Sequence, residues 1–502
     1  MDKPELYKKK PFFDSFMGIG LVIVLTFIAA IAISKGGIVA ALAFIGMPFI
    51  LAFLNKVFLK PEVGITTILA LGFLAIGVLR YLPGQVPLGL SIDAFLFLTY
   101  VALFLKSTTG YVPWKNAQSP LTLLAFIWFL YSLFELVNPE AQSKVAWFYA
   151  MRGVSLYMLM LIPLVFILYD DLKSFQFFIM VWGALSLLGT LKGLMQLYIG
   201  PDFAEQRWLD QGNAVTHILF GKLRVFSFYS DAGQFGAAQG HTGLVFSILA
   251  TECRIKKRKI FYIIVAIAGF WGMLISGTRG AIAAPGAGFM VYFVLKKNFK
   301  LTITGIVLLA LVYVFFRYTM LLNSNPQIRR MRTGFDPNNP SLQVRLHNQE
   351  ILRGYLKSRP FGGGIGSAGN WGQRFTPNGF LANVPTDSWY VAIWAEQGIV
   401  GLYLHLGILF YILGYGSYLI FFKLKHPLII NRTQALTAGH AGIMAVSYGN
   451  GVLGQLPTSV LLYTSMAYIF MAPKLEKELF ELEAKQKDLK KLKHKEDKYT
   501  VV

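Results

Sequence analysis

The chain has 502 residues, of which 55% are hydrophobic and 15% aromatic, and its mean hydropathy is +0.54. This composition predicts a polytopic membrane protein and excludes an ordinary soluble domain. The formal net charge is +22 at pH 7, but the basic residues fall in short clusters between apolar runs, which is typical of topology signals and argues against nucleic-acid binding. Cys253 is the only cysteine in the sequence, which excludes an internal disulfide and a thiolate metal site.

Apolar stretches of roughly membrane-spanning length recur along the chain and predict fourteen transmembrane helices. The polar, basic start from Met1 to Pro11 leads into the first stretch without a small-residue cleavage site, so we expect an uncleaved first helix. The fourteen stretches cover residues 16–34, 37–58, 63–82, 88–106, 119–137, 148–169, 172–199, 233–252, 258–276, 279–296, 299–321, 400–423, 433–452 and 457–473.

The basic clusters predict the orientation in the membrane. If the N-terminus with Lys8, Lys9 and Lys10 is cytoplasmic, the short-loop clusters, such as 254–259, also fall inside. An even number of helices then places both termini in the cytoplasm. The predicted parts of the chain are N-terminal helices (1–199), helices with outer arginine motifs (200–321), a large outer loop (322–399), C-terminal helices (400–473) and a charged cytoplasmic tail (474–502).

The polar segment 323–386 carries seven arginines and one lysine. The planar guanidinium matches phosphate, so this segment is expected to hold an anionic substrate. The predicted substrate-binding residues are Arg329, Arg330, Arg332, Arg353, Arg359, His347 and Ser388.

Three arginines fall on the same outer face once the topology is fixed. They are Arg224, Arg279 in the turn from Ser276 to Gly280, and Arg345 in the polar segment. A single arginine at a membrane boundary can simply reach the headgroups. Three on one face favour an anion site.

Asp387 ends the polar segment and allows two interpretations. It can cap the following helix, or it can accept a proton from an incoming hydroxyl; His347 is a weaker candidate base. The glycines from Gly362 to Gly366 predict a turn with positive φ and no nucleotide site, because the GKS/T ending is missing. The histidines lack metal-ligand spacing, so no metal is expected.

Charged residues within the apolar stretches should face the protein interior, because they are costly in lipid. They are Asp93, Glu135 and Lys192.

Several of these motifs resemble those of the O-antigen ligase and polymerase superfamily. In one of them, Asp387-Ser388 is followed by nine residues, then Gly398, two further residues and Gly401. This spacing is similar to the superfamily's His-[Asn/Ser/Gln]-x9-Gly-x-x-Gly motif, with Asp387 in place of the histidine. The turn from Ser276 to Gly280 looks like its Ser-x-x-Arg-Gly turn. The resemblance covers roughly residues 200–420 and also includes Arg224 before an aromatic-Ser run, and Arg345 followed by Pro360, Gly362, Gly364 and Gly366.

The resemblance implies an all-α glycosyltransferase of the GT-C type in the bacterial inner membrane, with its site facing the periplasm. The implied donor is a glycan on undecaprenyl diphosphate. The implied acceptor is a hydroxyl on the lipid A core of lipopolysaccharide for a ligase, or on another lipid-linked glycan for a surface polysaccharide polymerase. Arg224, Arg279 and Arg345 would neutralise the departing diphosphate, and Asp387 would orient or deprotonate the acceptor. We expect inversion, with no metal and no cofactor.

Two other classes stay open. Fourteen helices also suit a flippase for lipid-linked oligosaccharides, although a transporter more naturally places its charges at the membrane midplane. A peptidoglycan polymerase of the shape-and-division type also uses an acidic residue in a large outer loop, but it has fewer helices and different motifs.

Overall fold

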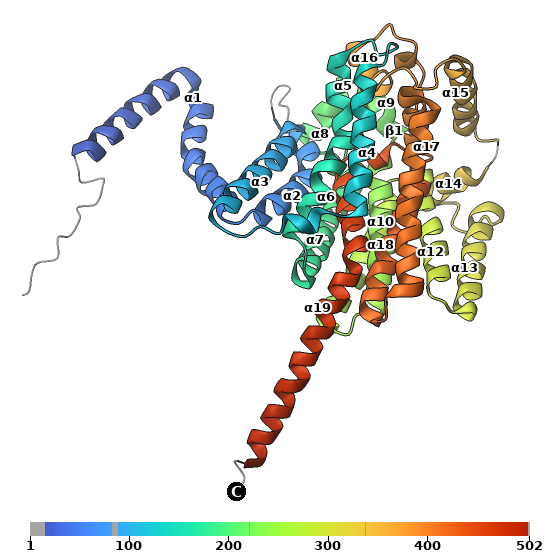
Figure 1. Ribbon diagram of the computed structural model, residues 1–502. Coiled ribbons are helices and arrows are strands. Elements are labelled where there is room, and N and C mark those ends of the chain that lie inside the picture. The colour runs from blue at the N-terminus through green and yellow to red at the C-terminus, as the bar shows by residue number, and fades with distance from the viewer. Residues whose placement is uncertain (1–15, 83–88, 220, 337, 500–502) are drawn as a thin grey trace, which may run out of the picture.

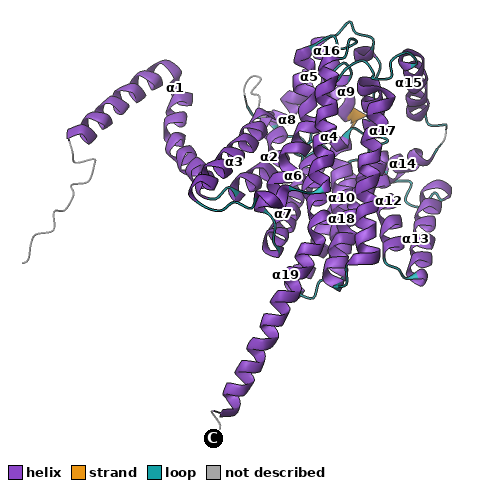
Figure 2. Ribbon diagram, in the orientation of Figure 1, coloured by secondary structure: helices purple, strands orange, loops and turns teal. Residues whose placement is uncertain are grey.

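The computed structural model describes residues 16–82, 89–219, 221–336 and 338–499, so the basic cluster at Lys8, Lys9 and Lys10 and the start from Met1 to Pro11 lie outside the described residues. The described chain is almost entirely helical (Figure 2), and its one sheet is the antiparallel pair β1 (Ile218–Leu219) and β2 (Lys222–Leu223). The prediction of an all-α membrane protein is confirmed.

The N-terminal part forms seven α-helices, and the first of them extends away from the bundle (Figure 1). That helix breaks at Gly37 (φ 58°, ψ −145°), the first residue of the second predicted stretch. The helices are α1 (Phe16–Leu59), α2 (Glu62–Leu79), α3 (Gly89–Thr109), α4 (Pro120–Phe134), α5 (Lys144–Met151), α6 (Tyr157–Leu168) and α7 (Leu172–Tyr198), with the π-helical turn η4 (Arg152–Leu156) joining α5 to α6.

The central part is built around a close helix pair. A Cβ on Gly269 of α11 would lie 2.7 Å from the backbone nitrogen of Gly243 in α10, so the two backbones touch, as small residues permit between membrane helices. This packing brings the end of α11 beside the start of α10. The helices here are α8 (Phe203–Trp208), α9 (Ala214–His217), α10 (Ala232–Thr251), α11 (Lys256–Ile275), α12 (Ala283–Leu295) and α13 (Phe299–Tyr318), with the π-helical turn η5 (Leu209–Asn213) and the 3-10 turn η6 (Arg279–Ile282).

The segment 323–386, predicted as one long loop, is folded into helices, and that part of the prediction is wrong. Its elements are α14 (Pro326–Arg332), η7 (Thr333–Phe335), α15 (Pro340–Leu356), α16 (Gly369–Phe375) and η8 (Leu381–Asn383). Asn339 caps α15 and Pro340 occupies its first turn, both strong helix-start signals. Leu352 and Leu356 then pack in a small core with Ala395, so α15 is fixed against the helix that follows.

The C-terminal part contains α17 (Trp389–Tyr418), the π-helical turn η9 (Leu419–Lys423), α18 (Pro427–Val446), the 3-10 turn η10 (Val452–Gly454) and α19 (Thr458–Tyr499). The end of α19 projects from the bundle at the end opposite to α15 and α16 (Figure 1). The two polar ends of the protein are therefore built differently, one as a folded cap and the other around a single projecting helix.

Eight of the described helical segments are long and apolar enough to cross a membrane. All fourteen predicted stretches lie mainly within helices, but the number of crossings, the GT-C type and the five-part division of the chain stay predictions.

The expectation for the charged residues in apolar stretches is confirmed. The carboxylate of Glu135 is fully buried and accepts a hydrogen bond from Asn138 at 2.7 Å. Asp93 pairs with Arg152 at 2.9 Å, and Lys192 pairs with Asp202 at 2.7 Å. Each charge therefore has a protein partner and does not face lipid alone.

Candidate functional site

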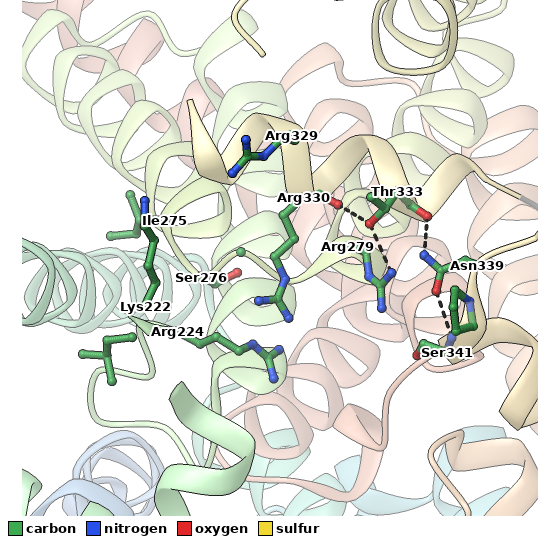
Figure 3. A pocket seen from close by; sticks show the side chains of 13 residues that line it. Lys222, Arg224, Ile275, Ser276, Arg279, Arg329, Arg330, Thr333, Asn339 and Ser341 are labelled. Carbon is green, nitrogen blue, oxygen red and sulfur yellow. Dashed lines mark hydrogen bonds between the residues drawn. The ribbon is translucent and has the colours of Figure 1, made fainter. Parts of the chain in front are cut away.

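A cavity of about 570 Å³ lies between the end of α11, the segment β2–Arg224 and α14 (Figure 3). We call it the arginine cavity. Its described lining includes five cationic side chains and no acidic one; the cations are Lys222, Arg224, Arg279, Arg329 and Arg330. Such a surface attracts an anion, because nothing in the wall neutralises the positive charge.

The turn after α11 places Arg279 at this cavity. Gly277 has φ 58°, a conformation that glycine adopts without strain. The Ser276 hydroxyl accepts a hydrogen bond from the Thr278 amide at 3.1 Å, and the Thr278 hydroxyl donates to the Ala232 carbonyl at 2.8 Å. The turn is therefore fastened to the first residue of α10.

The guanidinium groups keep donors free for a ligand. Arg224 donates to the Thr216 carbonyl and to the Thr278 hydroxyl, each at 3.2 Å, and Arg279 donates to the Thr333 hydroxyl at 3.1 Å. The Nε atoms of Arg224 and Arg330 are buried and have no hydrogen-bond partner among the described residues. Buried donors of this kind are normally satisfied, so an anion would complete the site.

The crowding of positive charge is visible in the pKa values. Burial, together with the charges of Arg224 and Arg279, lowers the pKa of Arg330 to about 10. Burial and the charge of Arg279 also lower the pKa of Arg224. Both groups stay protonated at neutral pH, and a bound anion would relieve their mutual repulsion.

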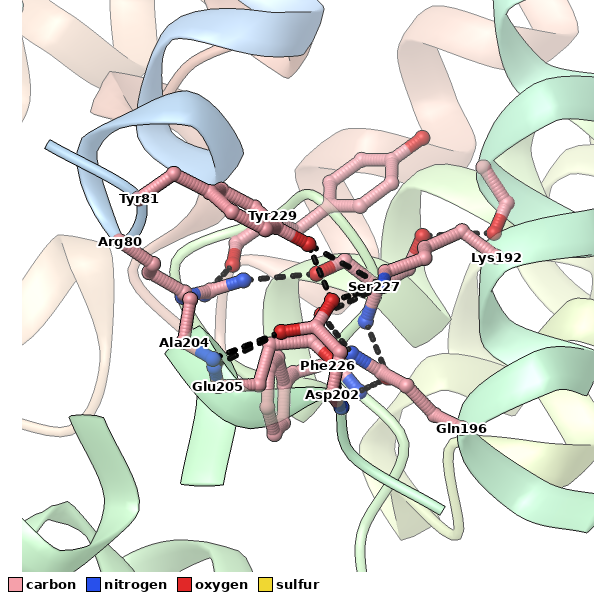
Figure 4. Close-up of polar contacts among 11 residues, drawn as sticks. Arg80, Tyr81, Lys192, Gln196, Asp202, Ala204, Glu205, Phe226, Ser227 and Tyr229 are labelled. Atoms are coloured by element: carbon pink, nitrogen blue, oxygen red, sulfur yellow. Dashed lines mark hydrogen bonds and ion pairs between the residues drawn. The ribbon is translucent and has the colours of Figure 1, made fainter. Parts of the chain in front are cut away.

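A polar cluster holds the backbone at Ser227 and Tyr229, which follow Arg224 in the chain (Figure 4). Arg80 donates to the Ser227 carbonyl at 2.7 Å and also to the Tyr229 carbonyl. The Gln196 side-chain oxygen accepts from the Ser227 amide at 2.8 Å. Side chains of α2 and α7 thus satisfy backbone groups just after Arg224 and fix its position.

The same cluster contains an ion network. Lys192 lies 2.7 Å from Asp202 and 3.1 Å from Glu205. Burial by itself raises the pKa of Asp202, but hydrogen bonds from Lys192 and Tyr81 outweigh it, and the pKa falls to about 2. The network anchors α8 to the end of α7.

Arg345 and Asp387 meet outside the arginine cavity. Arg345 Nε lies 3.1 Å from Asp387 Oδ2. Both residues border a larger space of about 710 Å³, which we call the second chamber. The interpretation of Asp387 as the helix cap is wrong: Ser388 caps α17 by accepting a hydrogen bond from the Val391 amide.

The two spaces are neighbours. A Cβ on Gly280, next to Arg279, would lie 3.0 Å from Asn450 Nδ2, and a Cβ on Gly233 would lie 3.0 Å from Asn450 Oδ1. Asn450 lines the second chamber, and its buried Nδ2 has no hydrogen-bond partner among the described residues. The wall between the two spaces therefore contains Asn450 and the backbone beside Arg279.

The other predicted substrate-binding residues are not among the described residues that line either space. Arg332 donates to the Phe315 carbonyl at 3.1 Å and fastens α14 to α13. Arg359 pairs with Glu140 at 2.9 Å. Arg353 and His347 are exposed on α15. Ser388 lies beside Asp387 but acts as the helix cap.

Several residues that line the two spaces are missing from the predicted set, and Lys222 and Asn450 are two of them. Lys222 stands two residues before Arg224, and this spacing is the signal that could have identified it. Asn450 is a polar residue at the edge of an apolar run, which by itself does not reveal that its amide faces a cavity.

The glycines of the 398–401 motif have structural roles. Gly398 has φ 66° and its backbone touches Pro360 and Gly362. Amides of the glycine turn donate to the helix at this break: Gly363 to the Ala395 carbonyl at 2.9 Å and Gly364 to the Glu396 carbonyl at 2.8 Å. The predicted positive φ of this turn is confirmed at Gly362, Gly364 and Gly366.

Comparison with known proteins identifies one family. Residues 264–406 match the family model described as O-antigen ligase. No curated protein matches the chain. The matched range contains Arg279, Arg330, Arg345 and Asp387, together with the glycine motif. The match supports the resemblance of this part of the chain to the superfamily of O-antigen ligases and polymerases.

Proposed function

We propose that the protein is an O-antigen ligase-like glycosyltransferase, which moves a glycan from undecaprenyl diphosphate to an acceptor hydroxyl at the periplasmic face of the inner membrane. The observation that carries this proposal is the arginine cavity, with five cationic and no acidic side chains in its described lining. The acceptor would be the lipid A core, and both termini would be cytoplasmic.

The diphosphate fits the arginine cavity by charge and by hydrogen-bond geometry. Arg224, Arg279 and Arg330 would donate to its oxygens, and their charge would stabilise the negative charge that grows as the diphosphate leaves. Arginine side chains can supply this stabilisation without a metal ion. Removing one preorganised donor of this type lowers the rate by about 10²–10³-fold.

An apolar cleft leads towards the arginine cavity and supports a donor with a lipid tail. It has a volume of about 340 Å³ and lies between α7 and α11. Ile275, the last residue of α11, lines the arginine cavity, and Trp271, one turn earlier, lines the cleft. A polyprenyl chain in the cleft would present its diphosphate to the arginines. The cleft residues are Leu187, Thr190, Leu191, Leu194, Ile264, Ile267, Ala268 and Trp271.

Asp387 is the proposed base. Its ion pair with Arg345 is partly exposed, with 34% of the Arg345 and 50% of the Asp387 side chain accessible. Exposed pairs contribute about 0–1 kcal/mol, so Arg345 can turn to an incoming diphosphate at little cost and release the carboxylate. Binding of the diphosphate by Arg345 would then be coupled to release of the Asp387 carboxylate, so the base would be available only when the donor is bound.

The reaction is a single displacement at the anomeric carbon. The acceptor oxygen forms the new glycosidic bond, and the bond from the anomeric carbon to the phosphate oxygen breaks. The electron pair of that bond goes to the diphosphate, while the acceptor proton goes to the Asp387 carboxylate. Attack from the opposite side to the leaving group inverts the configuration.

A surface polysaccharide polymerase would use the same chemistry with a lipid-linked acceptor. A flippase is less well supported, because the cations of the arginine cavity gather beyond the end of α11 and not midway along a spanning helix.

The test uses purified protein in nanodiscs with a glycan on polyprenyl diphosphate. We expect a new glycosidic product, lost in Arg330→Ala and kept in Arg353→Ala, since Arg353 is exposed on α15 away from the cavity. Movement of the lipid between leaflets without a new glycosidic bond would refute the proposal in favour of a flippase. The length of the product distinguishes a ligase from a polymerase: one transfer per acceptor indicates a ligase, and growing chains indicate a polymerase.

A further inference from the structure

The second chamber differs from the arginine cavity in charge. Its described lining has two cations, Arg152 and Arg345, and three acidic residues, Asp231, Asp387 and Glu396. Both cations are paired, Arg152 with Asp93 at 2.9 Å and Arg345 with Asp387 at 3.1 Å. A second polyanion therefore has little to bind here, although the two spaces are neighbours.

Aromatic rings form one wall of this chamber. Tyr149 and Trp371 line it, with ring centroids 5.1 Å apart and planes within 20° of parallel. Phe375 continues the stack at 5.5 Å from Tyr149. Trp389 adds a third lining ring, and its indole nitrogen donates to His405 at 2.9 Å, which fixes its orientation. Large, flat and rigid apolar faces of this kind suit the apolar faces of sugar rings.

Amides and carboxylates also line the chamber. Asn370, Asn450 and Gln455 line the chamber, and the buried Nδ2 of Asn450 has no partner among the described residues. Asp231 caps α10 through one carboxylate oxygen, and the other accepts a hydrogen bond from Ser230 at 2.9 Å. Neutral donors and acceptors beside aromatic faces match the hydroxyl groups of a glycan.

The aromatic wall is anchored at the turn that joins α5 to α6, where the chain departs from α-helical geometry. The π-helical turn η4 begins at Arg152, and such turns are frequent at functional sites. Arg152 lies 5.4 Å from the centre of the Tyr149 ring while it pairs with Asp93 of α3. The contact with Arg152 therefore fixes the position of the Tyr149 ring.

We propose that the second chamber is the binding site for the acceptor glycan, with Tyr149 and Trp371 as its sugar-stacking surface. This inference rests on the proposed function and assigns the acceptor side of it. Asp387 borders this chamber and not the arginine cavity. The hydroxyl that gives its proton to Asp387 must therefore come from a sugar in the second chamber, while the diphosphate occupies the arginine cavity.

The experiment measures two kinds of binding to the full-length protein in nanodiscs. Neutral bacterial oligosaccharides on a glycan array probe the second chamber, and inorganic pyrophosphate probes the arginine cavity. We expect wild-type protein to retain at least one neutral glycan. Tyr149→Ala and Trp371→Ala should weaken that retention by at least 10-fold and leave pyrophosphate binding within 2-fold of wild type. Tyr198→Ala, an exposed tyrosine at the end of α7, is the matched control and should change neither.

The outcomes separate the two proposals. No retention of neutral glycans by wild type, or equal retention by the Tyr149 and Trp371 variants, would overturn the acceptor assignment. Loss of pyrophosphate binding in those variants would overturn it as well, since the two spaces would then act as one. Pyrophosphate binding that survives Arg330→Ala would instead count against the proposed function.

Discussion

Arg345 on α15 and Asp387, which immediately precedes the cap of α17, form an ion pair with 3.1 Å between Nε and Oδ2. The residues are far apart in sequence and come together because Leu352 and Leu356 fix α15 against α17. The pair lies on the rim of the second chamber, beside the wall that separates it from the arginine cavity.

The role of Asp387 is tested by two substitutions. Asp387→Asn keeps the size and cannot accept the proton, so we expect glycan transfer to fall by about 10²–10⁴-fold. Asp387→His restores a base and should recover part of the activity. Initial rates at saturating donor are the measurement. Full activity of the asparagine variant would exclude Asp387 as the base.

The diphosphate assignment is tested at Arg279, which lines the arginine cavity, and at Arg345, which would turn from Asp387 to the incoming diphosphate. Arg279→Ala and Arg345→Ala should each lower transfer by about 10²–10³-fold, because each removes a charged donor near the leaving group. Monodisperse elution of the purified variants checks that they are folded. Wild-type rates in both variants would end this assignment.

The break in α17 requires glycine. Gly398→Ala should lower stability by about 1–3 kcal/mol from backbone strain, with a further loss from contact with Pro360. Gly407→Ala is the control, because the same helix has open space around Gly407. Thermal unfolding in detergent compares the two. A Gly398→Ala midpoint equal to that of Gly407→Ala would mean that the break is unnecessary for the fold.

The ion network at Asp202 predicts a pH dependence of stability. Its folded pKa of about 2 lies below the unfolded value of about 3.9. The carboxylate therefore stabilises the fold above about pH 4, and this contribution is lost as the pH falls from about 4 to about 2. Asp202→Asn should flatten the stability profile between about pH 4 and about pH 2. Asp210→Asn should leave it unchanged, because the Asp210 carboxylate accepts a hydrogen bond from the neutral side chain of Gln206. Parallel profiles for wild type and Asp202→Asn would contradict the network.

Local sequence signals predicted the helices well. The apolar runs marked where helices lie, because a span needs a sustained apolar sequence. The segment 323–386 was predicted as a loop because it is polar. Its helices depend on caps such as Asn339 and on a few buried leucines, and those signals are weak against the strong pattern of the spans.

The sequence also predicted Arg224, Arg279 and Arg330 as catalytic or substrate-binding residues, and the structure brings all three to one cavity. It could not distinguish them from Arg332 and Arg359, which have the same side chain. Arg332 donates to the Phe315 carbonyl, and Arg359 pairs with Glu140. Only three-dimensional contacts decide which guanidinium groups line the cavity.

By itself, the sequence determined that this is a helical membrane protein with an arginine-rich polar segment and an acidic residue before a glycine motif. Composition and spacing are sufficient for that, because they act locally along the chain. The tertiary structure alone decided that Asp387 pairs with Arg345, that Ser388 is the cap, and that an aromatic chamber adjoins the arginine cavity. Each of these depends on helix packing between residues distant in sequence, which no local pattern encodes.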